Sequence, residues 1–151
     1  MPDPIAMLKE DHKKVKDLFA QFEKADGRSK QRIVNEALME LDVHAAIEEE
    51  IFYPGVAKVT GEEIMAEAEE EHHVAKVLIA EIRKLEPSDV HYDAKFMVLS
   101  ENVKHHIQEE EKEMLPKSKD VGKDVLEKLG EQMMTRKEQL MKEMKSTARA
   151  S

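Results

Sequence analysis

The chain has 151 residues, enough for one compact domain, and it is rich in helix-forming charged residues (38%) and poor in aromatic ones (4%), which disfavours a strand-rich fold. Its net charge of −9 argues against a nucleic-acid partner, which needs a basic stripe, and against a surface that seeks anionic lipid. The sequence has no cysteine, which excludes disulfides, thiolate metal sites and cysteine nucleophiles.

Apolar residues at three- and four-residue steps predict four long helices followed by a fifth. The predicted bounds, in chain order, are 4–26, 29–53, 62–85, 89–114 and about 119–147. Gly27, Pro54-Gly55, Pro87 and Pro116 are the expected breakers. These lengths and short loops predict an all-α fold, an antiparallel up-and-down four-helix bundle over about 4–116 with an additional C-terminal helix, in a single domain.

The fifth predicted helix has an apolar stripe that begins at Val125, Leu129 and Met133. Gly130 weakens this helix by about 1 kcal/mol relative to alanine. We expect the helix either to pack alongside the bundle or to serve as a surface for a protein partner or for self-association. No run of 18 apolar residues spans a membrane, and no secretory signal is recognisable, so we expect a cytoplasmic protein without a membrane partner.

Each of the first four predicted helices carries a histidine on its apolar stripe, and two of these helices add a glutamate one turn later. The six residues are His12, His44, Glu48, His72, His106 and Glu110. A carboxylate in an apolar core costs several kcal/mol unless it is paired or bound to a metal, and these stripes offer no lysine or arginine. Imidazole and carboxylate together suit iron, manganese, zinc or copper. The pattern therefore predicts a metal centre.

The order of these residues repeats along the chain. A single histidine is followed, 32 and then 34 residues later (12 to 44 and 72 to 106), by a His-x-x-x-Glu motif, and a proline comes six residues after each glutamate. The repeat predicts a pseudo-twofold site with two metal ions. We expect His12 and His44 on one ion and His72 and His106 on the other. Glu48 and Glu110 are expected to bridge them.

Four segments carry a family resemblance: the sequence KEDH at 9–12, HAAIEEEIFYP at 44–54, EEHHVAKVLIAEI at 70–82 and HIQEEEKEMLP at 106–116. Over about residues 5–116 the chain resembles the hemerythrin family, in its bacterial HHE cation-binding branch. The resemblance implies two non-haem iron ions bridged by carboxylates and by an oxo or hydroxo group, which interact with O2, H2O2 or NO. Manganese and zinc are compatible with the same ligands.

Two positions depart from the oxygen-carrying hemerythrins. Those proteins have a His-x-x-x-His pair on the third helix, where this chain has Lys76, and an aspartate five residues after the fourth-helix histidine, where Glu110 comes at four. One metal therefore has one histidine fewer and an open position. This disfavours reversible oxygen carriage and favours a redox enzyme or a sensor.

Other polar residues near the motifs are expected to have ordinary roles. His73, His91 and His105 are expected on solvated faces, although a one-residue shift in register would exchange His73 with His72 or His105 with His106. The acidic neighbours Glu49, Glu50, Glu109 and Glu111 are expected to be exposed, with a role in supporting a ligand for one of them as the less favoured alternative. For Tyr53 we expect a packing or surface role, with a side chain that points toward the site from the end of its helix as the less favoured alternative.

We therefore expect a di-iron protein for redox or sensing chemistry, with peroxide decomposition as its enzymatic form. The alternative is an iron-binding, storage or iron-responsive interaction module without turnover. A ferritin-type oxidase ranks lower, because Glu69-x-x-His72 and Glu70-x-x-His73 lie on one helix, whereas ferritin-like bundles place such motifs on two. A metal-free interaction protein would need six unpaired polar residues in its core.

Overall fold

The structure is a computed structural model that describes residues 2–150, with side chains described as far as residue 146. Every regular element of this part of the chain is helical, which confirms the predicted all-α class. The elements are α1 (Pro4–Lys24), α2 (Gly27–Ile47), η1 (Glu48–Phe52), α3 (Tyr53–Thr60), α4 (Glu62–Lys84), α5 (Val90–Glu109), η2 (Glu110–Met114), α6 (Leu115–Ser118), η3 (Lys119–Val121) and α7 (Lys123–Ala150).

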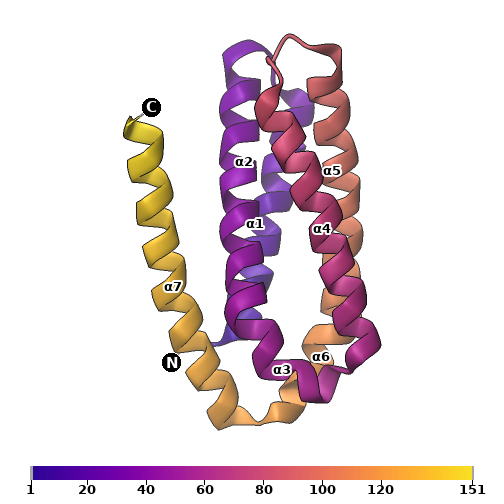
Figure 1. Cartoon of the computed structure of the whole chain (residues 1–151), viewed down its shortest axis with the longest axis vertical. Coiled ribbons are helices and arrows are strands. Elements are labelled where there is room, and N and C mark those ends of the chain that lie inside the picture. The colour runs from indigo at the N-terminus through magenta and orange to yellow at the C-terminus, as the bar shows by residue number, and fades with distance from the viewer. Residues whose placement is uncertain (1, 151) are drawn as a thin grey trace.

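The four long helices α1, α2, α4 and α5 lie side by side and run alternately up and down (Figure 1), as predicted. Short turns join them at one end of the bundle, and α3 and α6 lie at the other end. The last helix, α7, runs back along the outside of the bundle in contact with α1 and α2. Of the two expectations for the C-terminal helix, packing alongside the bundle is the one that the structure shows. No described helix has the length and apolarity needed to cross a bilayer.

Two apolar clusters fill the interior. On the long helices, the predicted ligands lie near the point where the residues of one cluster give way to those of the other. The first cluster lies toward the α1–α2 and α4–α5 turns and contains Phe19 and Phe96, whose rings meet edge to face at 5.5 Å. The second contains Leu8, Phe52 and, from α7, Met133. Each such fully buried side chain contributes about 1.5–3 kcal/mol. The bundle therefore holds a polar layer between two apolar clusters.

Pro54 and Pro116 do not end helices, contrary to the prediction. A π-helical turn precedes each proline, at η1 and η2, and the helix then continues. In these turns the amide of Tyr53 donates to the carbonyl of Glu48, and that of Leu115 donates to the carbonyl of Glu110. A proline lacks an N–H and clashes with the carbonyl four residues earlier, so one extra residue per turn accommodates it inside a helix.

Glycines end the two extended helices instead. Gly61 follows α3 and Gly122 follows η3, with φ values of 95° and 97°. Residues with a side chain rarely adopt this backbone conformation. The second and fourth predicted helices therefore run several residues further than expected, as far as Thr60 and Val121.

Close packing of α7 depends on glycines. A Cβ atom on Gly55 would lie 2.6 Å from a methyl group of Leu129, and one on Gly130 would overlap the carbonyl of Pro2. Gly130 thus serves a backbone contact, in addition to its cost in helix propensity. Val125, by contrast, is 42% exposed, so its expected place in the apolar stripe is wrong: the stripe begins at Leu126 and Leu129.

Candidate metal centre

The fold brings the six predicted residues together in one buried layer. His12, His44 and His72 are at most 8% exposed, Glu48 and Glu110 at most 2%, and His106 is slightly more accessible. The rings of His12 and His44 lie with their centroids 5.0 Å apart, and those of His72 and His106 lie 4.9 Å apart. The histidines thus form the two pairs that the sequence repeat predicts.

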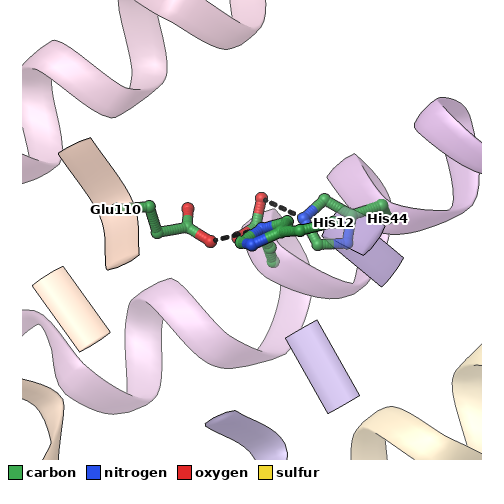
Figure 2. A group of neighbouring side chains, drawn as sticks. His12, His44 and Glu110 are labelled. Atoms are coloured by element: carbon green, nitrogen blue, oxygen red, sulfur yellow. Dashed lines mark ion pairs between the residues drawn. The ribbon is translucent and has the colours of Figure 1, made fainter. Parts of the chain in front are cut away.

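Each buried glutamate lies between the two pairs. An oxygen of Glu48 is 3.3 Å from Nε2 of His44 and 3.1 Å from Nε2 of His72. Figure 2 shows the carboxylate of Glu110 pointing toward the rings of His12 and His44. Its Oε1 is 3.2 Å from Nε2 of His12, and its Oε2 is 3.1 Å from Nε2 of His106. Each carboxylate therefore contacts one histidine of each pair.

Several polar atoms at the middle of this layer are buried without a hydrogen bond. They are Nε2 of His12, Nε2 of His44, both carboxylate oxygens of Glu48 and Oε1 of Glu110. The close pair His12–Glu110 lacks hydrogen-bond geometry even at 3.2 Å. Unsatisfied buried groups of this kind are costly, whereas a bound cation uses their lone pairs. The donors fit a metal ion.

The donor atoms fall into two groups, each with all of its atoms within 4.8 Å of one another. One group consists of His12, His44, Glu48 and Glu110, and the other of Glu48, His72 and His106. Imidazole nitrogen and carboxylate oxygen suit first-row transition metals. The two donor groups, each of which could hold a metal ion, share Glu48, and Glu110 contacts both histidine pairs.

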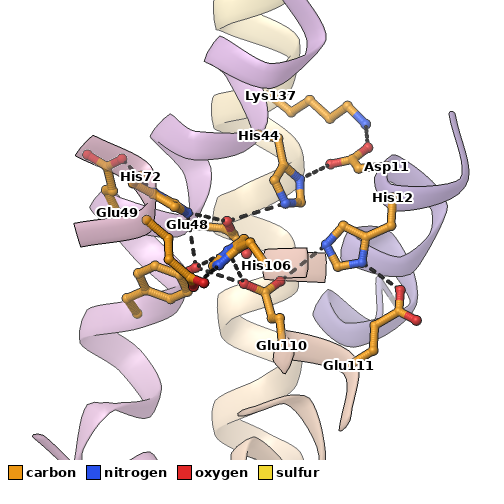
Figure 3. A network of polar contacts seen from close by, with 12 residues as sticks. Asp11, His12, His44, Glu48, Glu49, His72, His106, Glu110, Glu111 and Lys137 are labelled. Carbon is orange, nitrogen blue, oxygen red and sulfur yellow. Dashed lines mark hydrogen bonds and ion pairs between the residues drawn. The ribbon is translucent and has the colours of Figure 1, made fainter. Parts of the chain in front are cut away.

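A second set of carboxylates surrounds the first (Figure 3). The sequence suggested such a role for at most one of the acidic neighbours, and not for Asp11 or Glu71. Asp11 of α1 accepts a hydrogen bond from Nδ1 of His44 at 2.9 Å, and Glu49 of η1 accepts one from Nδ1 of His72 at 2.8 Å. A proton held on Nδ1 leaves the lone pair of Nε2 facing the centre, as a metal ligand requires.

The other two histidines are held in the same way. Glu71 of α4 lies 2.7 Å from Nδ1 of His106, and Glu111 of η2 lies 2.6 Å from Nδ1 of His12. Each carboxylate thus orients the histidine of the next helix around the bundle. The expectation that Glu49 and Glu111 are exposed is wrong. Both side chains are only about one third exposed, and the carboxylate of each contacts a histidine ring nitrogen.

Two lysines complete the network on its outside. Lys137 of α7 donates to Asp11 at 2.6 Å, and Lys76 of α4 donates to Glu49 at 2.6 Å. Lys76 comes four residues after His72 on the same helix. Its ammonium group supports the carboxylate that orients His72.

Tyr53 points into the centre, so the less favoured of its two expected positions is the one that the structure shows, and the packing or surface role is wrong. Its hydroxyl donates to Glu110 at 2.7 Å and lies 3.2 Å from Nε2 of both His72 and His106. The side chain is 5% exposed. The corresponding position of the other half-repeat, nine residues after its histidine, is the buried Leu115. A phenol therefore adjoins only the histidine pair of α4 and α5, and the two halves of the site differ.

The neighbouring histidines stay outside the centre. His73, His91 and His105 are exposed, so the expected solvated positions are confirmed and no register shift exchanges them with His72 or His106. Glu50 pairs with Arg136 and Glu109 with His105, both at 3.1 Å at the surface.

Without metal, hydrogen bonds and ion pairs raise the pKa values of three of the histidines, His44, His72 and His106. Burial lowers the pKa of His106, but hydrogen bonds with Glu110 and Glu71 outweigh this effect and raise the pKa to about 10. Burial opposes charge on His44 as well, yet Glu48 and Asp11 raise its pKa well above 6.5. Burial raises the pKa of Glu110, but the close contacts with His106 and His12 outweigh it, so the pKa lies well below its ordinary value of 4.5.

These shifts predict how the stability of the metal-free chain depends on pH. The protonated histidines stabilise the fold fully below their unfolded pKa of 6.5, and this contribution is lost as pH rises through their folded pKa, about 10 for His106. Ionised Glu110 stabilises the fold fully above pH 4.5, and this stabilisation is lost as pH falls through its lowered pKa. The free energy of unfolding, measured with urea on the chelated chain, should therefore decrease between about pH 6 and about pH 9. An increase over that range would contradict the ion-pair network.

Comparisons with known proteins agree with this geometry. The sequence model of the hemerythrin HHE cation binding domain matches residues 3–118. The chain belongs to this family. A crystal structure of a hemerythrin HHE cation binding domain-containing protein from Mycobacterium kansasii superposes with a TM-score of 0.86 at 27% identity, over 99% of this chain and 93% of that one. The family resemblance and the hemerythrin-like bundle are thus confirmed.

Two further relatives come from other bacteria. An uncharacterised protein of Mycobacterium tuberculosis is 30% identical over 138 residues, which is 89% of this chain and 84% of that protein. A DNA nickase of Nostoc sp. is 29% identical over 106 residues, or 70% of this chain, but the chain spans only 30% of its length.

Proposed function

We propose that this chain binds two iron ions on His12, His44, Glu48, His72, His106 and Glu110 and carries out redox or sensing chemistry with dioxygen, peroxide or nitric oxide. The observation that carries the proposal is the set of buried, unpartnered nitrogen and oxygen atoms that face one another across the layer. The family's cation-binding character supports a metal at this place.

Iron is favoured by the ligand count. Each ion would have two imidazoles and shared carboxylates, and two histidines with a carboxylate and open positions are typical of non-haem iron. Iron so held supplies one-electron redox steps and open coordination positions for a small oxygen or nitrogen ligand. Manganese and zinc suit the same donors, so elemental analysis decides between the three.

A small cavity next to the centre favours a small ligand. It has a volume of about 50 Å³, enough for a few water-sized molecules, and its lining includes His12, His44, His72 and His106. The remaining lining includes apolar side chains such as Val15, Ala75, Ile79 and Val103. A space of this size and character accepts a diatomic molecule or a peroxide and excludes an ordinary metabolite.

The hydroxyl of Tyr53 lies beside one half of the centre, where it is positioned for proton transfer. Its hydroxyl donates to Glu110, and burial together with the charges of Glu48 and Glu110 raises the pKa of this phenol well above 10 in the metal-free chain. Decomposition of two peroxide molecules to two water molecules and dioxygen reduces one peroxide and oxidises the other, and both halves move protons. We assign Tyr53 the role of proton donor and acceptor beside Glu110.

The test is the response of the iron-loaded chain to peroxide. We expect a visible absorption band of the iron pair that changes on addition of peroxide, together with evolution of dioxygen. Metal-dependent stabilisation with no spectral change toward peroxide, dioxygen or nitric oxide would instead support the second candidate, an iron-binding or iron-responsive module without turnover. The contact of Lys137 with Asp11 favours that candidate, because it links α7 to His44.

Replacing Tyr53 with phenylalanine removes the phenolic hydroxyl and keeps the ring, so packing should change little. We expect the variant to keep two iron ions and to evolve dioxygen about 10- to 100-fold more slowly, the usual range for loss of one general acid or base. Tyr92 is the only other tyrosine and is 3% exposed in the first apolar cluster, so Tyr92→Phe is the matched control. Equal rates in the two variants would contradict a role for Tyr53 in proton transfer.

A further inference from the structure

A row of carboxylates leads from the surface to the candidate metal centre between α4 and α5. Glu67 and Glu71 lie one turn apart on α4, and Glu109 and Glu113 lie one turn apart at the end of α5 and in η2. All four line a pocket of about 20 Å³, room for one water-sized species, whose lining also includes the proposed ligands His106 and Glu110. The two helices lie against each other (Figure 1).

This pocket differs in charge from the other two pockets that touch the centre. Lys76 is part of the lining of both of those. The pocket between α4 and η2 has no lysine or arginine in its lining among the residues that the structure describes. Glu110 is buried there, with Oε1 lacking a hydrogen bond. With five glutamates and no lysine or arginine among its described lining residues, this pocket is the most negative of the three and the one that most favours a cation.

A cluster of donors lies at the outer end of this row, made of the exposed His105 and the half-buried Glu71 and Glu109. Nε2 of His105 is 3.1 Å from Glu109 and 3.9 Å from Oε2 of Glu71, and one donor atom from each of the three lies within 4.8 Å of the others. The other oxygen of Glu71 holds Nδ1 of His106. Glu71 therefore contacts the outer cluster with one carboxylate oxygen and a histidine of the buried centre with the other.

We propose that Glu71, His105 and Glu109 form a third, weak site for a divalent transition metal, which captures the ion at the surface and passes it along the carboxylate row to His106 and Glu110. One imidazole and two carboxylates suit Fe²⁺, Mn²⁺, Co²⁺ or Zn²⁺. Exposure and a small ligand set keep the affinity low, as a transfer site requires. The inference rests on the proposed metal centre, because the ion needs that destination.

The test uses the metal-free full chain and Co²⁺. Titration calorimetry should show two tight equivalents and a third, weaker one, and the double variant His105→Ala/Glu109→Gln should lose only the third. Stopped-flow absorption should show this variant filling the centre roughly tenfold more slowly at low salt, since electrostatic steering contributes at least that much to association rates. The final content of two ions should be unchanged. Glu71 is left intact because it orients His106.

The matched control is His91→Ala/Glu86→Gln, which makes the same changes at exposed positions near the α4–α5 turn. It should load like the wild type and keep the third equivalent. Two tight equivalents with no third, or equal loading rates in both double variants, would overturn the third site and leave the metal centre standing. A chain that binds no Co²⁺ at all would overturn both proposals.

Discussion

Replacing Glu48 with glutamine should leave the chain unable to hold two metal ions. Glu48 is fully buried, contacts Nε2 of both His44 and His72, and belongs to both groups of donor atoms. The neutral amide of glutamine has nearly the same shape as the carboxylate, but it lacks the negative charge that two cations need. Since loss of a hydrogen-bond partner of a ligand already costs about 10- to 100-fold in metal affinity, loss of a shared ligand should cost more than about 100-fold. Elemental analysis after iron loading and desalting measures the content.

The control is Glu40→Gln. Glu40 is also a buried glutamate, but it pairs with Lys14 at 2.7 Å and belongs to neither donor group. This variant should retain two ions, whereas Glu110→Gln should behave like Glu48→Gln. Two tightly bound ions in Glu48→Gln would show that Glu48 does not bridge them.

Removing the metal from the wild-type chain should lower its melting temperature by about 10–20 °C at neutral pH. At a free metal concentration 100 times the dissociation constant, each site stabilises the fold by about 2.7 kcal/mol, so two sites contribute about 5 kcal/mol. For a domain of this size, 1 kcal/mol shifts the melting temperature by roughly 2–4 °C. Differential scanning calorimetry of loaded and chelated protein measures the shift.

The same comparison in Glu48→Gln supplies the control, because its melting temperature should respond much less to chelation. The wild-type difference should also grow as pH rises, since the metal displaces protons from His44, His72 and His106. Identical melting of loaded and chelated wild type would contradict the metal centre.

The fold and the convergence of the six residues followed from periodicity alone. A polar residue on an apolar stripe faces the core wherever the helix is regular, and His12, His44, His72 and His106 all lie on regular stretches. The rings of His12 and His44, and those of His72 and His106, lie next to each other, as their predicted places on two metal ions require. The same reasoning placed His73 and His105 outside, one position away from the stripe.

The position of Tyr53 was not the one favoured from the sequence, because the helix is not regular there. Five residues along an α-helix carry a side chain about 140° around the axis, so Tyr53 would face away from Glu48. The π-turn joins Tyr53 to Glu48 by a hydrogen bond over five residues and returns it to the same face. The signal available was Pro54 inside a pattern that continues beyond it, which indicates an irregular turn at least as well as an end.

The orienting carboxylates were not predicted as a set, for a different reason. Each is adjacent in sequence to a proposed ligand: Asp11 to His12, Glu49 to Glu48, Glu71 to His72 and Glu111 to Glu110. Adjacent residues lie about 100° apart on a helix, so none of them shares the stripe of its own neighbour. Each instead reaches the histidine of the next helix. Only the packing of neighbouring helices reveals that contact, although the repetition of the acidic neighbours in both halves was visible.

The most direct test of the metal centre is a crystal structure of the iron-loaded chain with anomalous scattering recorded at the iron edge. Two anomalous peaks should appear in the buried layer, one beside His12 and His44 and the other beside His72 and His106, with Glu48 and Glu110 between them. A buried layer without an anomalous peak, in protein loaded and handled without chelator, would contradict it.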